Sequence, residues 1–173
     1  MTVARRHRTP AGAAAVAAAL ALGLVGCDGG QETTPTAHVT AGGVTVTTTL
    51  LHRSDGRPEL RTTFSPGQRG FHLYSVDLPA HGIDGLGIPT RLAVRGGLTA
   101  DGRPKADVTT RLLRPAGLPT EIPVYPDGPV TFTLPVRQAG NAQRAEVVVS
   151  YGACSENRCL VPVTDEVIRL DLK

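Results

Sequence analysis

The sequence predicts an all-β protein, an antiparallel sandwich of two packed sheets. After residue 37, apolar residues alternate with polar ones and no segment has a helical stripe. A period of two places the apolar side chains on one face of a strand. Asp-Gly pairs at 55–56, 84–85, 101–102 and 127–128 mark tight turns, because glycine accepts positive φ and aspartate caps the turn. Many short strands at close spacing favour an antiparallel sandwich over alternating strands and helices.

Eight strands are expected in chain order. Segment 44–48 is β-branched throughout, 130–136 has an apolar residue at every second position, and 168–172 alternates in the same way. A valine run at 147–149 indicates a strand that is covered on both faces or twisted at its end. The expected strands are 39–51, 58–64, 70–78, 89–96, 105–113, 129–137, 144–151 and 165–172.

Two segments rich in proline and glycine, 79–89 and 114–128, are predicted to be long loops. Loops on a rigid sandwich are where binding surfaces usually sit. A true antibody domain is marked by a buried tryptophan and a cysteine pair that joins the two sheets. This chain has no tryptophan and no cysteine pair with that spacing. The predicted fold is therefore immunoglobulin-like in architecture only.

The first 26 residues are predicted to be a secretory signal peptide. Residues 1–10 carry three arginines and no acidic residue, and residues 11–25 are wholly apolar or glycine. This is the pattern of a basic n-region followed by a short apolar h-region. Such an h-region spans roughly 22 Å as a helix, less than the ~30 Å hydrocarbon core of a bilayer. The alternative, a permanent transmembrane helix, is disfavoured by this length.

The end of the signal peptide, Leu24-Val25-Gly26-Cys27, resembles the lipobox of bacterial lipoproteins. That resemblance implies that Cys27 receives a diacylglyceryl group, and two acyl chains are enough for stable anchoring in a lipid bilayer. The expected location is the extracytoplasmic face of the cell membrane. Residues 27–37 form a polar tether whose last ten residues span roughly 17 Å, and residues 38–173 form the folded domain. The alternative is an ordinary signal peptide cut near Gly26.

Composition and charge exclude two further classes. With 40% hydrophobic and 19% charged residues, the chain is too apolar to be disordered. Three of the 18 basic residues lie in the predicted signal peptide, which leaves 15 to match 15 acidic residues. A near-neutral mature protein is poorly suited to binding nucleic acid, which requires clustered phosphate contacts.

Cys154 and Cys159 are separated by Ser-Glu-Asn-Arg, a four-residue turn that places them opposite each other in a hairpin. Opposed strand residues have Cα atoms ~4.5–5.5 Å apart, within the ~4.4–6.8 Å that a disulfide accepts. The expected compartment is also oxidising. A disulfide between these two cysteines is therefore geometrically easy.

Such a bond can be a structural staple or a reagent. Closing a loop this short stabilises a fold by roughly 2 kcal/mol in the chain-entropy model, against about 4.7 kcal/mol for a hundred-residue loop. Arg158 adjoins Cys159 and favours its thiolate, whereas Glu156 offers Cys154 no such help. These observations favour redox chemistry with Cys159 as the better nucleophile, and an inert hairpin disulfide is the alternative.

Three segments resemble the N-terminal domain of DsbD, the thiol–disulfide interchange protein of bacterial membranes. The similarity spans residues 38–173, and its cysteine segment is the most specific part. The matching segments are Ser65-Pro66-Gly67 with Gly70-Phe71-His72-Leu73-Tyr74-Ser75, Val124-Tyr125 with 130–136, and Tyr151-Gly152-Ala153-Cys154 with Cys159-Leu160-Val161-Pro162. The resemblance implies an immunoglobulin-like sandwich and disulfide exchange by the hairpin cysteines.

The resemblance also implies a role for each site residue. Cys159 would form the mixed disulfide with a partner, and Cys154 would resolve it. Phe71 and Tyr74 match aromatic residues that shield the pair. A cap loop would fall at 117–121, where Leu118 stands in place of an aromatic residue, and Pro162 follows Val161 where the family often has a second proline.

The expected function is that of a membrane-anchored protein-disulfide reductase component. It would pass reducing equivalents from a thioredoxin-like protein or a membrane thiol protein of the CcdA/DsbD type to a client disulfide protein. The chemistry implied needs no metal, nucleotide or flavin. Because the chain ends at Lys173, it is expected to be a free-standing version whose partners are separate polypeptides.

Two hypotheses from other classes stay open. In the first, the cysteines and one of His38, His52, His72 or His81 bind zinc or copper; His72 is the histidine that lies in a matching segment. In the second, the chain is a non-catalytic interaction lipoprotein that uses the hairpin disulfide as a staple.

Overall fold

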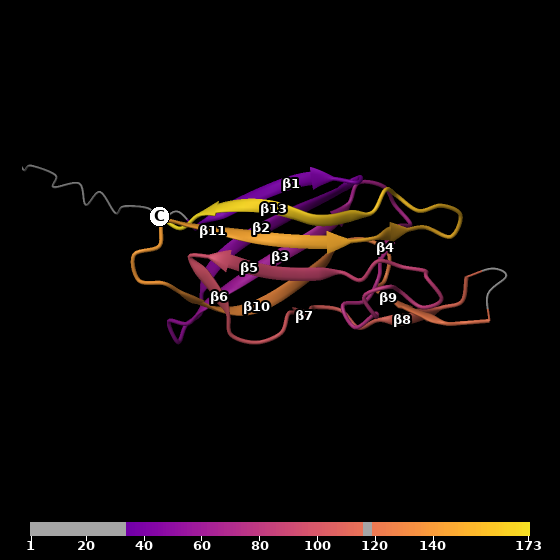
Figure 1. Ribbon diagram of the computed structural model, residues 1–173, viewed down its shortest axis with the longest axis horizontal. Helices are drawn as coiled ribbons and strands as arrows, with labels where there is room; N and C mark the ends of the chain where they lie inside the picture. Colours follow the sequence, from indigo (N-terminus) through magenta and orange to yellow (C-terminus); the bar gives the residue numbers. More distant parts are fainter. Residues whose placement is uncertain (1–33, 116–118) are drawn as a thin grey trace, which may run out of the picture. The chain divides into compact units, whose positions relative to one another are not determined.

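A computed structural model describes residues 34–115 and 119–173, and every helix or strand element found there is a β-strand (Figure 1). The prediction of an all-β antiparallel fold is confirmed. No helix in the described part of the chain is long and apolar enough to cross a membrane. The strands are β1 Thr36–Ala41, β2 Val44–His52, β3 Pro58–Pro66, β4 His72–Leu73, β5 Arg91–Gly96, β6 Leu98–Ala100, β7 Lys105–Ala106, β8 Arg111–Leu113, β9 Ile122–Val124, β10 Val130–Gln138, β11 Arg144–Tyr151, β12 Ala153–Cys154 and β13 Val163–Asp171.

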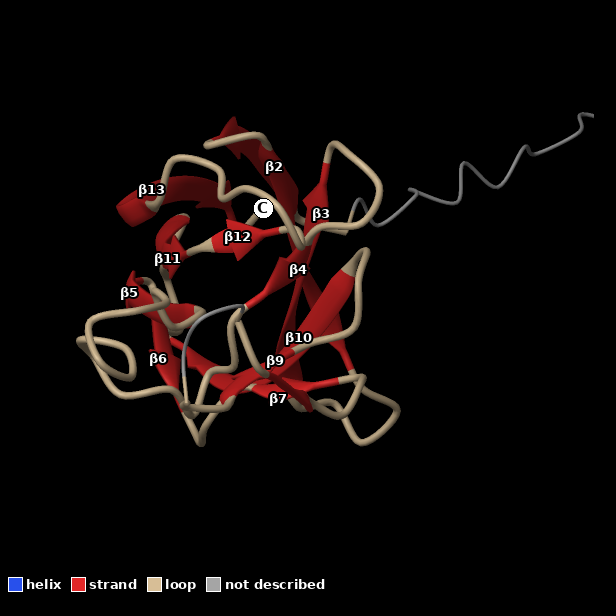
Figure 2. Cartoon of the chain, turned by 90° about the vertical axis from the view of Figure 1, so that its right-hand side faces the viewer, coloured by secondary structure: helices blue, strands red, loops and turns tan. Residues whose placement is uncertain are grey.

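Two antiparallel sheets form an immunoglobulin-like sandwich. The larger has the order β1-β2-β3-β10-β6, with β7 also paired to β10, and the smaller has the order β13-β11-β5. In Figure 2, β13, β11 and β5 lie on one side and β2, β3 and β10 on the other. Burial alternates residue by residue along β2 and β10, as period two predicts.

The core between the sheets depends on a few aromatic rings. Phe64 of β3 packs edge-to-face on Phe132 of β10, with ring centroids 5.5 Å apart, and on Tyr151 of β11, with centroids 5.4 Å apart. The Tyr151 hydroxyl donates a 2.9 Å hydrogen bond to the Ala41 carbonyl of β1. Phe64 therefore connects both sheets, and the aliphatic residues of β2, β10 and β11 fill the space around it.

The single strand expected at 39–51 is in fact two. Gly42 and Gly43 adopt φ of +52° and +74° and form a two-residue turn, after which Val44 pairs with Ala41. Positive φ at both central residues is what a type I′ hairpin turn requires. The turn is also crowded, because a Cβ added at Gly42 would lie 2.5 Å from the Val161 carbonyl oxygen.

The shorter strands differ most from expectation. Segment 70–78 contains only β4, segment 105–113 breaks into β7 and β8, and β9 lies in segment 114–128, where a loop is expected. Each of these strands has two or three residues, too few for a period of two to be visible. The remaining predicted strands agree with β3, β5, β10, β11 and β13 to within two residues at each end.

One local ladder positions the cysteine hairpin. β12 pairs with β4, so that Cys154 lies opposite His72 and Ala153 opposite Leu73. On the other side of β4, the amides of Tyr125 and Gly128 bond to the carbonyls of Leu73 and Phe71, both at 2.9 Å. β4 is therefore the central strand of this ladder, with the cysteine hairpin on one side and residues 125–128 on the other.

Candidate active site

Cys154 and Cys159 form a disulfide at the tip that follows β12. Their Cα atoms are 4.0 Å apart, closer than the ~4.4–6.8 Å expected for a disulfide. The turn between them is closed by its own hydrogen bonds. The Ser155 amide bonds to the Arg158 carbonyl at 2.8 Å, and the Arg158 amide donates to Ser155 Oγ at 3.3 Å. Below the disulfide, the Leu160 amide donates to the Ala153 carbonyl at 2.9 Å. The predicted four-residue hairpin is therefore formed by the backbone itself.

The two cysteine residues differ in their exposure to solvent. Cys154 is only 5% exposed, whereas Cys159 is exposed. Because a disulfide is broken by in-line attack of a thiolate on one sulfur, the exposed Cys159 offers a protein-sized partner the easier approach.

Tyr74 is the residue placed against the buried sulfur. Its hydroxyl lies 3.1 Å from Cys154 Sγ and acts as the donor, because a disulfide sulfur carries no proton. Burial raises the pKa of Tyr74, so this donor keeps its proton over the range in which thiols ionise. A Cβ added at Gly87 would lie 2.9 Å from the Tyr74 ring, and one added at Gly152 would lie 3.2 Å from it. These two glycines let the backbone close on both edges of the ring and hold it in place.

We expect Tyr74→Phe to make the disulfide harder to reduce. The hydroxyl stabilises a thiolate more than a disulfide sulfur, since hydrogen bonds to charged groups are the stronger ones. Loss of about 1 kcal/mol from the reduced form corresponds to a shift of about 20 mV toward a more negative potential. Equilibration of the full chain with glutathione buffers measures the shift.

Tyr125→Phe is the matched control for this potential. Tyr125 is also buried, but its hydroxyl accepts a 3.3 Å hydrogen bond from the Val76 amide and does not contact a sulfur. Equal potentials for the wild type and Tyr74→Phe would contradict a role for the Tyr74 hydroxyl.

Arg158 and Phe71 lie on the other flank of the hairpin. The Arg158 guanidinium carbon is 5.2 Å from the centroid of the Phe71 ring, and Arg158 also donates a hydrogen bond to Gln68. Phe71 is itself buried in the sandwich core. The cation is therefore held at the hairpin by a ring below it and by an amide beside it, while Tyr74 is the aromatic residue in contact with a sulfur.

An open groove of about 490 Å³ runs beside the disulfide. The cysteine hairpin and Tyr74 form one wall, and side chains from the β8–β9 hairpin and from residue 86 form the other. That second wall consists of Leu86, Leu113, Arg114, Pro115 and Ile122. The groove is therefore largely apolar around the disulfide, and its lining includes three charged side chains, Arg114, Glu156 and Arg158.

The predicted cap at 117–121 is only partly described. Leu118 lies outside the described residues, as does the lipidation residue Cys27. In the described part, Thr120 donates a 2.6 Å hydrogen bond to Asp84, and Glu121 pairs with Arg114 at 2.9 Å. Pro162 is exposed beyond Cys159, next to Val161, whose exposed fraction is 76%.

Sequence reasoning misses the second wall of the groove and the position of His72. Leu86, Leu113 and Ile122 lie in segments without strong periodicity, and only the pairing of β8 with β9 brings the last two together. From the sequence alone, His72 is one of four histidines that could bind a metal together with the cysteines. No group of three or more His, Cys, Asp or Glu side chains arranged to hold a metal is found in 34–115 and 119–173.

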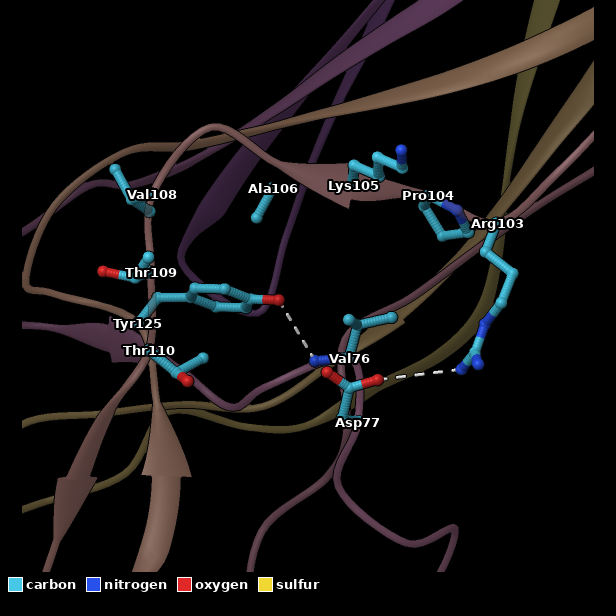
Figure 3. A pocket seen from close by; sticks show the side chains of 10 residues that line it. All are labelled: Val76, Asp77, Arg103, Pro104, Lys105, Ala106, Val108, Thr109, Thr110 and Tyr125. Atoms are coloured by element: carbon cyan, nitrogen blue, oxygen red, sulfur yellow. Dashed lines mark hydrogen bonds and ion pairs between the residues drawn. The ribbon is translucent and has the colours of Figure 1, made fainter.

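A second hollow of about 360 Å³ lies beside Tyr125 (Figure 3). Arg103 and Asp77 form an exposed ion pair of 3.7 Å at one end of it, and the Tyr125 hydroxyl accepts from the Val76 amide. Its lining contains neither a cysteine nor a histidine. We therefore place the candidate active site at the disulfide groove.

Fold and site together define an antiparallel β-sandwich that carries a hairpin disulfide between one buried and one exposed cysteine. Among solved structures, the chain is similar to the reduced form of the DsbD n-terminal domain from Neisseria meningitidis, a crystal structure. The TM-score is 0.43 and the identity 14%, over 81% of this chain and 83% of that chain. This is the same domain that the sequence resembles. No family model matches the sequence, and no curated protein matches it.

Proposed function

We propose that this chain is an extracytoplasmic thiol–disulfide exchange protein, acting as a protein-disulfide reductase component. It takes reducing equivalents from a thioredoxin-like or CcdA/DsbD-type membrane thiol protein and passes them to a client disulfide protein. The observation that supports this most is the asymmetry of the pair, with Cys159 exposed beside an open groove and Cys154 buried against the Tyr74 hydroxyl.

The proposed reaction proceeds in two exchanges. In the reduced chain, the Cys159 thiolate attacks the client disulfide, forms a mixed disulfide and releases one client thiolate. The Cys154 thiol then loses its proton and attacks Cys159 Sγ, which forms the Cys154–Cys159 disulfide and releases the second client thiolate. Two electrons have moved to the client, and the reductant of the chain reverses the change. The short Cα separation of 4.0 Å keeps the resolving thiol within reach.

The small contribution of this disulfide to stability favours a redox-active bond over a purely structural one. The hairpin is already closed by backbone hydrogen bonds on both sides of the turn, from Ser155 to Arg158 and from Leu160 to Ala153. A disulfide across so short a loop adds roughly 2 kcal/mol in the chain-entropy model. A bond that contributes so little to the fold can open and close without unfolding the sandwich.

Reduction by a thioredoxin-like protein tests the proposal. The full chain should lose its disulfide when mixed with a reduced thioredoxin-like protein, and its potential should lie above about −300 mV, below which structural disulfides usually fall. Alkylation with a mass tag and electrophoresis measure the fraction reduced. A disulfide that stays closed in this mixture would instead support an interaction lipoprotein with a structural bond.

We further propose that Cys27 is lipidated and that residues 27–37 tether the domain to the extracytoplasmic face of the membrane. The lipobox-like sequence 24–27 supports this. Cys27→Ala, or treatment with globomycin, should move the protein from the membrane fraction to the soluble fraction on cell fractionation. Unchanged membrane association would refute the lipid anchor while leaving the redox proposal intact.

A further inference from the structure

The cysteine hairpin has a buried imidazole beneath it that the two exchange steps do not use. His72 is fully buried within β4 and lies directly opposite Cys154 in the β4–β12 ladder. Side chains of directly opposed residues in an antiparallel pair emerge on the same face, with Cβ atoms about 4.5–5.5 Å apart. Tyr74, two residues along, shares that face, and its ring packs edge-to-face on His72 at 6.3 Å between centroids.

One nitrogen of His72 has a partner and the other has none. Nδ1 lies 3.3 Å from Asp127 Oδ1, and Asp127 also pairs with Arg111 at 3.2 Å. A carboxylate accepts only, so Nδ1 carries the proton and Nε2 is a bare acceptor. Nε2 is buried and has no hydrogen-bond partner among the described residues. An unmet acceptor of this kind costs free energy and calls for an explanation.

The oxidised state of the hairpin supplies that explanation. The two ring nitrogens of an imidazole face in roughly opposite directions, and Asp127 lies on the side of β4 away from β12. We infer that Nε2 faces toward the cysteine side of the ladder, where Cys154 lies opposite His72. A disulfide sulfur has no proton to donate, whereas reduction gives Cys154 an S–H group. Nε2 of His72 lacks a donor in the oxidised chain, and the S–H group of Cys154 in the reduced chain can supply one.

We propose that His72 is the general base that prepares Cys154 for the resolving step, with Asp127 as the residue that positions it. Nε2 takes the proton of the Cys154 thiol as that sulfur attacks Cys159 Sγ. The client sulfur leaves as a thiolate and is protonated in turn, so the proton balance closes. The charged and titratable groups around His72 are Asp127 before β10, Arg111 on β8, Tyr74 just after β4 and Cys154 on β12.

The electrostatics suit this role. Burial lowers the pKa of His72 from its ordinary value of 6.5, although Asp127 opposes the shift, and Arg111 adds to the lowering. The imidazole is thus neutral at neutral pH and free to accept a proton. Asp127, whose side chain is about half exposed, fixes the tautomer by accepting from Nδ1.

This inference rests on the proposed exchange chemistry but can be tested without a physiological partner. The full chain carrying Cys27→Ser is reduced and mixed with one equivalent of 5,5′-dithiobis(2-nitrobenzoate). Attack by Cys159 releases the first thionitrobenzoate, and resolution by Cys154 releases the second, so absorbance follows both steps. A domain that fails to accept electrons from a thioredoxin-like protein can still give this readout, and the two failures are therefore distinguishable.

We expect His72→Gln to slow the second release by at least about tenfold at neutral pH and to leave the first nearly unchanged. Glutamine fills the site and can donate to Asp127, but it is not a base. The deficit should disappear above about pH 9, where the thiol ionises unaided. Equal slowing of both releases, an unchanged second release, or a deficit that is the same at every pH would each overturn the proposal.

Asp127→Asn gives a second measurement that does not alter the buried residue. It should slow the second release several-fold while the first is unchanged, because the tautomer of His72 is no longer fixed. Asp77→Asn is its matched control, since Asp77 is an exposed carboxylate that pairs with Arg103 instead. If His72→Gln does not fold, as circular dichroism would reveal, a second release that is equally fast in Asp127→Asn and Asp77→Asn rejects the role of His72.

Discussion

Replacing Cys159 with alanine is expected to reduce disulfide exchange with a protein partner to background, whereas replacing Cys154 is expected to trap that partner. In the proposed reaction the exposed Cys159 bonds to the partner and the buried Cys154 releases it. A reduced chain with Cys154→Ala should therefore accumulate a covalent complex with an oxidised thioredoxin-like protein. Non-reducing electrophoresis measures the complex, which should disappear on adding dithiothreitol.

The control for this experiment is the chain in which both hairpin cysteines are alanine. All variants carry Cys27→Ser, so that no third thiol contributes. The double variant should form no complex, and neither should Cys159→Ala. A complex formed by Cys159→Ala at the wild-type level would reverse the roles of the two cysteines and contradict the assignment based on their exposure.

Phe64→Ala is expected to destabilise the sandwich by about 3–5 kcal/mol. The Phe64 side chain has no exposed surface, and it makes edge-to-face contacts with Phe132 in its own sheet and with Tyr151 in the other. Each such aromatic pair adds about 0.5–1.5 kcal/mol beyond the buried area. Urea denaturation followed by far-UV circular dichroism measures the free energy of unfolding.

Leu112→Ala is the matched control for stability. Leu112 lies on β8 with 64% of its surface exposed, so its truncation should change the free energy of unfolding by no more than about 0.5 kcal/mol. If Phe64→Ala cost as little as this control, the two sheets would not depend on the aromatic contacts at the centre of the sandwich.

The sequence predicts those strands in which a period of two runs for six residues or more. The expected bounds of β10 and β11 agree with the structure to within one residue, because alternation or a valine run is unmistakable over that length. β4, β9 and β12 cannot be seen in the sequence, since two or three residues carry no period. The double glycine at 42–43 falls inside an expected strand, although positive φ at both residues makes it a turn.

The residues proposed for the candidate site can be picked out from the sequence, but how deeply each is buried cannot. The cysteines, Tyr74 and Arg158 are visible as motif residues. That Tyr74 contacts Cys154 depends on a ladder between segments 80 positions apart, and so does the place of His72. The local sequence does not indicate which distant residues such a ladder brings together. Non-local pairing therefore decides which of the four histidines adjoins the cysteines.

The crowding of the β1–β2 turn has a practical consequence for anyone who shortens this protein. Gly43 packs on Leu160, and Gly42 packs on Val161 and Val163, the residues that carry the chain back from Cys159. A soluble version that starts after residue 43 would lack the β1–β2 turn against which residues 160–163 pack. Truncations intended for redox assays should therefore begin no later than Thr36, where β1 starts.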